Sequence, residues 1–236
     1  MRRSGRNLLR ALLALLLVLV VLGVFWFGLV PQRYSPFAPI SLDDPPTWFI
    51  DPRLAAMRHD PALCRAVLRA PHIVARPIAD HVQPNGCGWT NAVSIAQVAG
   101  AEIGLDQLTC EAATALALWM EQDVQPLAVA AFGGRVTWVQ DMGTYACRNI
   151  IGNSKWIHTR SQHSLANAVD IGAFRLENGK QISVIADYKR DTPEGRFLRE
   201  VHMRACRYFR VALGPEFNAA HYNHMHFDRG ILVRCK

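Results

Sequence analysis

The sequence predicts an α+β domain, in which a small antiparallel or mixed sheet is flanked by helices, preceded by one transmembrane helix. Three observations lead to this prediction: a continuous apolar block at residues 8–30, runs rich in Val and Ile, and segments with apolar residues at helical spacing. A chain of 236 residues is long enough for one domain of ordinary size and a short additional segment.

The apolar block from Leu8 to Val30 contains one charged residue, Arg10, near its edge. About 20 apolar residues suffice to cross a bilayer as a helix. Three more arginines lie before the block, so we expect residues 1–7 to stay in the cytoplasm and the rest of the chain to be exported. A cleaved signal peptide is the alternative. The block is long for one and no Ala-x-Ala site follows it before residues 31–34, which favours an uncleaved signal-anchor.

The segment 31–60 is rich in proline and lacks periodicity, which predicts an extended tether between the membrane and a globular domain at 61–236. Residues 61–68 predict a short helix with proline in its first turn. Thr109 is the predicted N-cap of a second helix. The apolar face of that helix contains Ala112, Leu116, Trp119 and Met120.

A third helix is predicted to begin after Thr192 and to continue until Gly214-Pro215. Strands are expected after the glycine turn at 133–134, over 168–173, over 181–186 and at 224–228. The second and third of these strands are joined by a turn at 177–180. These elements together give the α+β class.

The chain carries 26 basic residues (Lys and Arg) and 19 acidic ones, for a net charge of +7. Four of the basic residues are the arginines at positions 2, 3, 6 and 10, so the part after the apolar block has 22 basic and 19 acidic residues, a net charge of +3. That charge is too mild for a nucleic-acid footprint. Nucleic acid is therefore not an expected partner.

Six cysteines follow the apolar block: Cys64, Cys87, Cys110, Cys147, Cys206 and Cys235. An even number on the exported side is typical of disulfides in an oxidising compartment. We expect sequential pairing, 64–87, 110–147 and 206–235. Buried free thiols are the alternative, and a cysteine zinc site is disfavoured because no Cys-x-x-Cys pair exists.

Histidines and one aspartate are the candidate metal ligands. If HMHFD at 224–228 is a strand, His224 and His226 face the same side while the residues between them enter the core. A catalytic zinc site uses three protein ligands, drawn from His nitrogen and carboxylate oxygen. His163 and Asp170, in SQHSLANAVD, would supply two ligands, and one His of the pair the third. Any one of them alone is as readily a surface or cap residue, so the combination carries the prediction.

The chain resembles the extensin-like C-terminal domain family of bacterial envelope proteins, related to the D-alanyl-D-alanine metallopeptidases and the lysostaphin and hedgehog-type group. The resemblance runs from Cys64 to Cys235. The motifs that carry it are GC at 86–87, LTCEA at 108–112, GTYACR at 143–148, SQHSLANAVD at 161–170, FLR at 197–199, AC at 205–206, LGP at 213–215 and HYNHMHFD at 221–228.

This resemblance implies a zinc site of His163, Asp170 and His226. It also implies that His224 supports a ligand or acts as general base. His221 stands where some relatives carry a further active-site histidine, although a surface position is equally expected. The resemblance further gives Arg148 the task of stabilising an oxyanion or binding a substrate carboxylate. The remaining candidate, Ser161, would bind the substrate backbone or fix His163, or it is simply a loop hydroxyl.

The function that follows is a membrane-anchored periplasmic zinc peptidase, single-pass in a bacterial inner membrane, which hydrolyses peptidoglycan stem or cross-link peptides. Two positions depart from the family pattern: Gln162 replaces a glutamate, and Ala166 replaces a glycine. The alternative from another class is a non-catalytic zinc-containing cell-wall-binding module of the same fold. A serine hydrolase is disfavoured because no Gly-x-Ser-x-Gly elbow is present. A scaffold held only by disulfides would leave the histidines unexplained.

Overall fold

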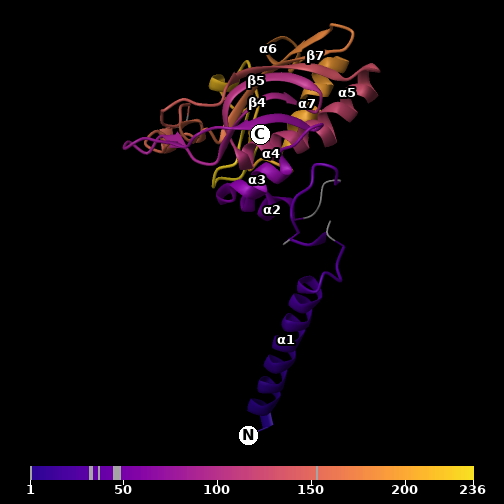
Figure 1. The fold of residues 1–236 in the computed structure, drawn as a ribbon, viewed down its shortest axis with the longest axis vertical. Helices are drawn as coiled ribbons and strands as arrows, with labels where there is room; N and C mark the ends of the chain where they lie inside the picture. Colours follow the sequence, from indigo (N-terminus) through magenta and orange to yellow (C-terminus); the bar gives the residue numbers. More distant parts are fainter. Residues whose placement is uncertain (1, 32–33, 37, 45–48, 153) are drawn as a thin grey trace.

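A computed structural model describes residues 2–31, 34–36, 38–44, 49–152 and 154–236 of the chain. Helix α1 (Arg2–Trp26) stands apart from the rest of the described chain, and an α+β domain follows it (Figure 1). Residues 5–26 of α1 form a helix long and apolar enough to cross a membrane. The predicted α+β class, with a mixed sheet, helices and one N-terminal apolar helix, is confirmed.

The predicted tether at 31–60 is extended only in part, and its residues 32–33, 37 and 45–48 lie outside the described residues. Its second half contains α2 (Ile50–Ala56) and the short 3-10 helix η2 (Met57–His59). Leu54 and Met57 are fully buried in the core. The packed domain therefore includes residues before position 61, because two apolar side chains three positions apart give even this short segment a face to bury.

One mixed sheet contains nine strands of the described chain. Their order is β1 (Ile73–Pro77), β4 (Ala92–Val98), β5 (Ala101–Thr109), β6 (Val136–Gly143), β7 (Ala168–Leu176), β10 (Met225–Asp228), β9 (Val211–Leu213) and β11 (Arg234–Cys235), and β8 (Gln181–Ser183) pairs with β7. The β5–β6 and β9–β11 pairs are parallel and the others antiparallel. A separate hairpin is formed by β2 (His81–Val82) and β3 (Gly88–Trp89).

Helix α4 (Cys110–Trp119) lies against β4 and β5 of the sheet and contacts α2, α3 (Pro61–Val67) and the π-helical turn η3 (Met120–Val124) (Figure 1). Helices α5 (Gln125–Phe132) and α6 (Val184–Asp187) both contact α7 (Pro193–Ala205). Trp119 contacts Phe174 of β7 and Phe227 of β10, with ring centroids 6.1 and 5.0 Å away. All ten residues of α4 are buried. The prediction gave this helix one buried apolar face, whereas the structure buries it on all sides.

The two predicted helix caps are confirmed. The hydroxyl of Thr109 accepts a hydrogen bond from the backbone N–H of Ala112 at 3.4 Å, and that of Thr192 accepts one from Gly195 at 3.3 Å. Helix α7 nevertheless ends at Ala205 rather than near Gly214. The chain beyond it pairs with β10 and β11 as strand β9, so strand pairing ends the helix well before the glycine.

The predicted strand at 181–186 is half correct, since β8 ends at Ser183 and the residues that follow form α6. The carboxylate of Asp187 accepts a hydrogen bond from the N–H of Ser183 at 2.9 Å, which closes this helical turn. Local side-chain bonding of this kind competes with strand pairing. The turn at 177–180 is confirmed, with Gly179 in the left-handed region at a φ of 81°.

Three disulfides connect the six cysteines, in agreement with the prediction that all of them are bonded. Their pairing is Cys64–Cys110, Cys87–Cys147 and Cys206–Cys235. The expected 206–235 bond is confirmed, and the expected 64–87 and 110–147 bonds are wrong. Packing of α3 against the start of α4 brings the Cα atoms of Cys64 and Cys110 to 5.9 Å, so tertiary contact rather than order along the chain selects the partner.

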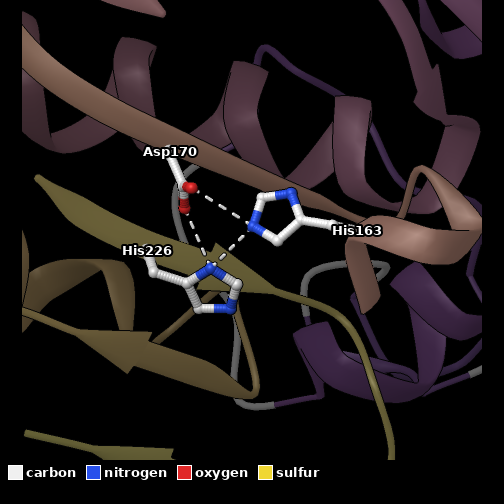
Figure 2. A group of neighbouring side chains, drawn as sticks. All are labelled: His163, Asp170 and His226. Carbon is white, nitrogen blue, oxygen red and sulfur yellow. Dashed lines mark hydrogen bonds and ion pairs between the residues drawn. The ribbon is translucent and has the colours of Figure 1, made fainter. Parts of the chain in front are cut away.

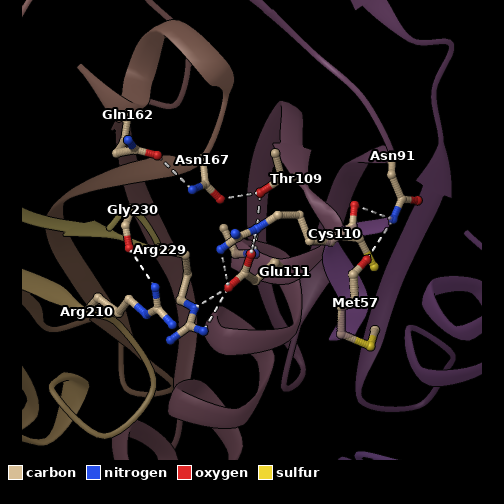
Figure 3. A network of polar contacts seen from close by, with 12 residues as sticks. Met57, Asn91, Thr109, Cys110, Glu111, Gln162, Asn167, Arg210, Arg229 and Gly230 are labelled. Carbon is tan, nitrogen blue, oxygen red and sulfur yellow. Dashed lines mark hydrogen bonds and ion pairs between the residues drawn. The ribbon is translucent and has the colours of Figure 1, made fainter. Parts of the chain in front are cut away.

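A network of charged side chains, centred on the buried pair Glu111 and Arg229, joins α4 to the end of β10 (Figure 3). The carboxylate of Glu111 accepts from Nη2 and Nε of Arg229 at 2.7 and 3.0 Å, and from Nε of Arg58 at 2.7 Å. Arg229 also donates to Asp51 at 2.6 Å, and Arg210 donates to the same carboxylate. The hydrogen bond from Arg210, with further attraction from Arg229, outweighs partial burial and lowers the pKa of Asp51 to about 2.

Stability is expected to fall as the pH drops below 6.5, in part because of His202. This side chain is buried between Tyr188, whose hydroxyl lies 2.6 Å from Nδ1, and Gly214, and burial lowers its pKa, opposed by the Ala212 carbonyl and by Glu216. Between the lowered folded pKa and the unfolded value of 6.5, only the unfolded chain takes up this proton, so acid favours unfolding. We expect His202→Gln to reduce the loss of thermal stability between pH 7 and pH 5. An unchanged pH dependence in this variant would contradict the assignment.

Candidate metal centre

The three predicted ligands meet in space, although 63 positions separate the first from the last. His163 comes from the 3-10 turn η5 (Gln162–Leu165), Asp170 from β7 and His226 from β10 (Figure 2). Each offers one ligand atom, and these atoms lie within 4.8 Å of one another. His163 Nε2 is 3.1 Å from His226 Nδ1 and 3.2 Å from Asp170 Oδ2, and His226 Nδ1 is 2.9 Å from Asp170 Oδ1.

Strand register positions two of the ligands. His226 of β10 lies directly opposite Asp170 of β7 in the antiparallel pair. Met225 and Phe227 are fully buried in the core on the other face, as the alternation along a strand predicts. The burial of these two apolar side chains fixes which face carries the histidine, because a shift of one residue would send it into the core.

The turn η5 positions the third ligand. The hydroxyl of Ser161 accepts a hydrogen bond from the backbone N–H of His163 at 3.3 Å, and so caps the turn. Ala166 closes the turn in the left-handed region, at a φ of 49° and a ψ of 31°. A residue with a Cβ adopts this conformation at a cost of about 1–2 kcal/mol. Only then does the chain enter β7 and reach Asp170.

The second nitrogen of each ligand imidazole is already engaged. The N–H at Nδ1 of His163 donates to the carbonyl of Thr144 at 3.3 Å, and the N–H at Nε2 of His226 donates to Asp228 at 3.0 Å. Second contacts of this kind set the tautomer and ring orientation of metal-ligating histidines. The two remaining nitrogens face each other with a carboxylate oxygen beside them, and this donor set fits zinc.

The charges of the centre stabilise a cation. Burial raises the pKa of Asp170, but the hydrogen bonds from His163 and His226 outweigh burial and hold the pKa well below its usual range. Burial lowers the pKa of His226, but the carboxylates of Asp170 and Asp228 outweigh it and raise the pKa to about 9. Two buried carboxylates on one imidazole thus favour positive charge at the centre, which either a proton or a metal ion can supply.

Two further histidines lie beside the three ligands. His224 Nε2 is 3.6 Å from Asp170 Oδ2, and its Nδ1 is 2.9 Å from Asn223 Oδ1. Burial lowers the pKa of His224, against the attraction of Asp170. His221 forms ring contacts with His224 and His226, at centroid distances of 5.2 and 5.7 Å, and burial lowers its pKa to about 4. Both side chains are therefore neutral bases at pH 7.

The centre opens into a cavity of about 370 Å³. The polar side chains named above share its lining with apolar ones, among them Ile150, Ile151, Trp156, Phe217 and Val233. Arg148 also lines this cavity, and its charge contributes to the lowering of the pKa of His224. All seven site residues that the sequence suggested lie in or at this one cavity: His163, Asp170, His226, His224, His221, Arg148 and Ser161.

Residues 62–236 match a family model described as extensin-like protein C-terminus. The chain belongs to this family. The match covers most of the chain and contains every residue of the centre. No curated protein and no solved structure matches the chain.

The side chain of Gln162 in this extensin-like domain forms its hydrogen bond with Asn167 rather than with a candidate ligand. Its Oε1 accepts a hydrogen bond from Asn167 at 2.8 Å, and Asn167 in turn accepts one from Thr109 at 2.6 Å (Figure 3). The side chain therefore links η5 to the N-cap of α4. A neutral amide is sufficient for this contact, because the N–H of Asn167 requires only an acceptor oxygen.

Sequence reasoning missed two groups that support the ligands of the extensin-like domain. Asp228 lies two residues after His226 on the same strand, and this spacing alone places both side chains on one face. The strand signal at 224–228 was therefore sufficient to find it. The carbonyl of Thr144 is a backbone group from a distant segment, and no pattern of side chains in the sequence predicts its position.

Proposed function

We propose that this protein is a membrane-anchored, zinc-dependent peptidase that hydrolyses stem or cross-link peptides of peptidoglycan. The observation that carries the proposal is the convergence of two imidazole nitrogens and one carboxylate, each supported by a second contact, in an open cavity. The proposed kinship with the D-alanyl-D-alanine metallopeptidases and the lysostaphin group is part of this inference.

His163, Asp170 and His226 would hold the metal through three protein ligands. Three ligands are typical of catalytic zinc sites, whereas structural sites have four. Zinc at such a site acidifies a water molecule and polarises a carbonyl group. The extensin-like domain supplies the remaining tasks, which are proton transfer, charge stabilisation and binding of the peptide.

His224 is the proposed general base. Its Nδ1–H donates to Asn223, so the lone pair on Nε2 is available on the side of Asp170. A buried neutral imidazole accepts a proton from water and passes one to the leaving amine. Arg148, beside His224 in the cavity, would stabilise the negative charge that develops on the carbonyl oxygen.

His221 and Ser161 have supporting tasks in this proposal. His221 donates from Nδ1 to Asn218 at 2.7 Å and contacts the ring of His224, which holds His224 in place. The buried hydroxyl of Ser161 orients His163 by capping its turn, so its proposed role is to fix a ligand rather than to bind the substrate.

The proposed location is a single pass through a bacterial inner membrane, with the domain in the periplasm. The apolar surface of α1 and the arginines before it support this orientation. The three disulfides suit an oxidising compartment, and the periplasm is one. Peptidoglycan is the peptide-bearing polymer within reach of an enzyme held there.

The direct test uses the full chain in detergent with its disulfides formed. Zinc content is measured by elemental analysis, and the same preparation is incubated with purified peptidoglycan while released peptides are followed by mass spectrometry. Stoichiometric zinc with peptide release supports the peptidase. Zinc without cleavage would favour the non-catalytic cell-wall-binding module instead, and no zinc after loading would exclude both.

His224→Ala is expected to lower the turnover rate by about 10²–10⁴-fold, the usual contribution of a positioned general base. Zinc content should be unchanged, because the three ligands remain. Tyr222→Ala is the matched control, since this neighbouring side chain is exposed and does not line the cavity. Full turnover in the His224 variant would show that another group takes the proton.

A further inference from the structure

Besides Arg148, two arginines of the cavity wall have no carboxylate partner in the part of the chain that the structure describes. Arg160 and Arg234 line the cavity from two segments far apart in the sequence. Nη2 of Arg160 donates to the carbonyl of Asn85 at 2.9 Å, and the guanidinium of Arg234 lies 5.0 Å from the ring centroid of Phe217. Each is thus held by one neutral contact, which leaves several N–H donors unused.

Seven other arginines of the domain form ion pairs with carboxylates: Arg58, Arg190, Arg196, Arg204, Arg207, Arg210 and Arg229. The two carboxylates that line the cavity, Asp170 and Asp228, are engaged by the histidines of the metal centre. The cavity therefore has unpaired positive charge on its wall, and its lining within the described chain offers no free acidic group to neutralise that charge.

We propose that Arg160 and Arg234 determine specificity by binding free carboxylates of an anionic peptide substrate. This inference rests on the proposed peptidase function and narrows its substrate class. The guanidinium group presents a planar fork of donors that matches a carboxylate with two parallel hydrogen bonds. Arg148 remains available to stabilise the oxyanion. The three arginines would therefore bind different negatively charged groups of one substrate.

Both arginines are anchored at the backbone, which favours binding. Arg234 precedes Cys235, which is bonded to Cys206, and belongs to the edge strand β11. The backbone of Arg160 pairs with that of Asn149 in an antiparallel bridge. Asn149 lies two residues after Cys147, which is bonded to Cys87. Groups already held in place lose less conformational entropy when a ligand binds.

The test compares two synthetic pentapeptides: one with a free glutamate side chain and a free carboxyl terminus, the other the same peptide amidated at both positions. Binding is measured by calorimetry on the full-length His224→Ala protein, which should not consume the peptide. We expect the amidated peptide to bind about 100-fold more weakly, because removal of each charge-assisted hydrogen bond weakens binding about tenfold. Arg160→Gln and Arg234→Gln should each weaken binding of the free peptide about tenfold and leave the amidated one unchanged.

Arg196→Gln is the matched control, because this exposed arginine pairs with Asp191 and does not line the cavity. Equal affinity for the two peptides would overturn the inference, and so would an equal decrease in affinity for both peptides in the variants. The affinities of the two peptides are also compared on the His224→Ala protein, in which all arginines are present. That comparison does not depend on whether the arginine variants fold correctly. If binding depends on the carboxylates but the wild-type protein does not cleave the peptide, the inference about the arginines stands and the proposed peptidase function is contradicted. If both peptides are bound equally and cleaved, the peptidase function is supported and the inference about the arginines is contradicted.

Discussion

Replacement of His163 by alanine is expected to abolish both zinc binding and peptide hydrolysis. The variant keeps only two of the three ligands, Asp170 and His226. Loss of a mere supporting partner of a ligand typically lowers metal affinity or activity by about 10–100-fold, so loss of a ligand should exceed about 100-fold. Zinc content is measured after dialysis against a metal buffer, and turnover is measured on the same sample.

His158→Ala is the control for this prediction, because His158 lies five residues away, is exposed and does not line the cavity. The thermal unfolding curve of each variant shows whether the domain is intact. The metal centre is contradicted if the folded His163 variant retains a full equivalent of zinc. A variant that retains zinc but loses turnover would instead indicate that His163 acts on the substrate.

Glu111→Ala is expected to destabilise the domain by about 3–5 kcal/mol, the usual effect of breaking a buried ion pair by removing one partner. Glu111 and Arg229 are both only 1% exposed at the side chain, so the variant leaves the guanidinium of Arg229 buried with one carboxylate partner fewer. Asp51 remains on its other side but is largely exposed. A decrease of the melting temperature on the order of 10 °C would follow.

Glu200→Ala is the matched control, because Glu200 forms an ion pair with Arg204 on the surface of α7. Such a pair contributes about 0–1 kcal/mol. Denaturant unfolding of both variants, with the disulfides intact, gives the two free energies of unfolding. Equal stability of the two variants would show that the buried network contributes no more than a surface pair.

The Glu111 network also links stability to the metal centre. Arg229 directly follows Asp228, whose carboxylate accepts from His226. The backbone N–H of Arg229 donates to the carbonyl of Asn167, and Asn167 lies between the two ligands His163 and Asp170 in the sequence. We therefore expect the network to hold the end of β10 and the start of β7 in register, which is where the ligands lie opposite each other.

Much of the fold was predictable from local patterns. The caps at Thr109 and Thr192 and the strand predicted at 224–228, observed as β10 from Met225 to Asp228, depend on residues close together in the sequence. Strand β5 was also within reach, although no prediction covered it. Apolar residues at 101, 103, 105 and 108 are buried, with exposed or half-buried residues between them, after a turn at Ala99-Gly100.

Two failures of prediction, the end of α7 and the disulfide pairing, share a physical cause, which is that a partner far away in the sequence decided the outcome. Helix α7 ends at Ala205 because the residues after it complete the sheet between β10 and β11. Cys64 bonds to Cys110 rather than Cys87 because α3 packs on α4. Neither the competing sheet nor the helix contact leaves a local signature in the sequence.

The sequence by itself determined the α+β class, the helix caps and the face of β10 that carries His226, because caps and strand alternation are local properties. The family resemblance, rather than a local pattern, selected His226 over His224 as the third candidate ligand. Only the tertiary structure decided which disulfides form and how the imidazoles are supported. It also showed that the unpaired guanidinium groups of Arg160 and Arg234 lie around the same cavity. These features depend on distances between side chains from separate strands and loops, and packing sets such distances only when the whole domain has folded.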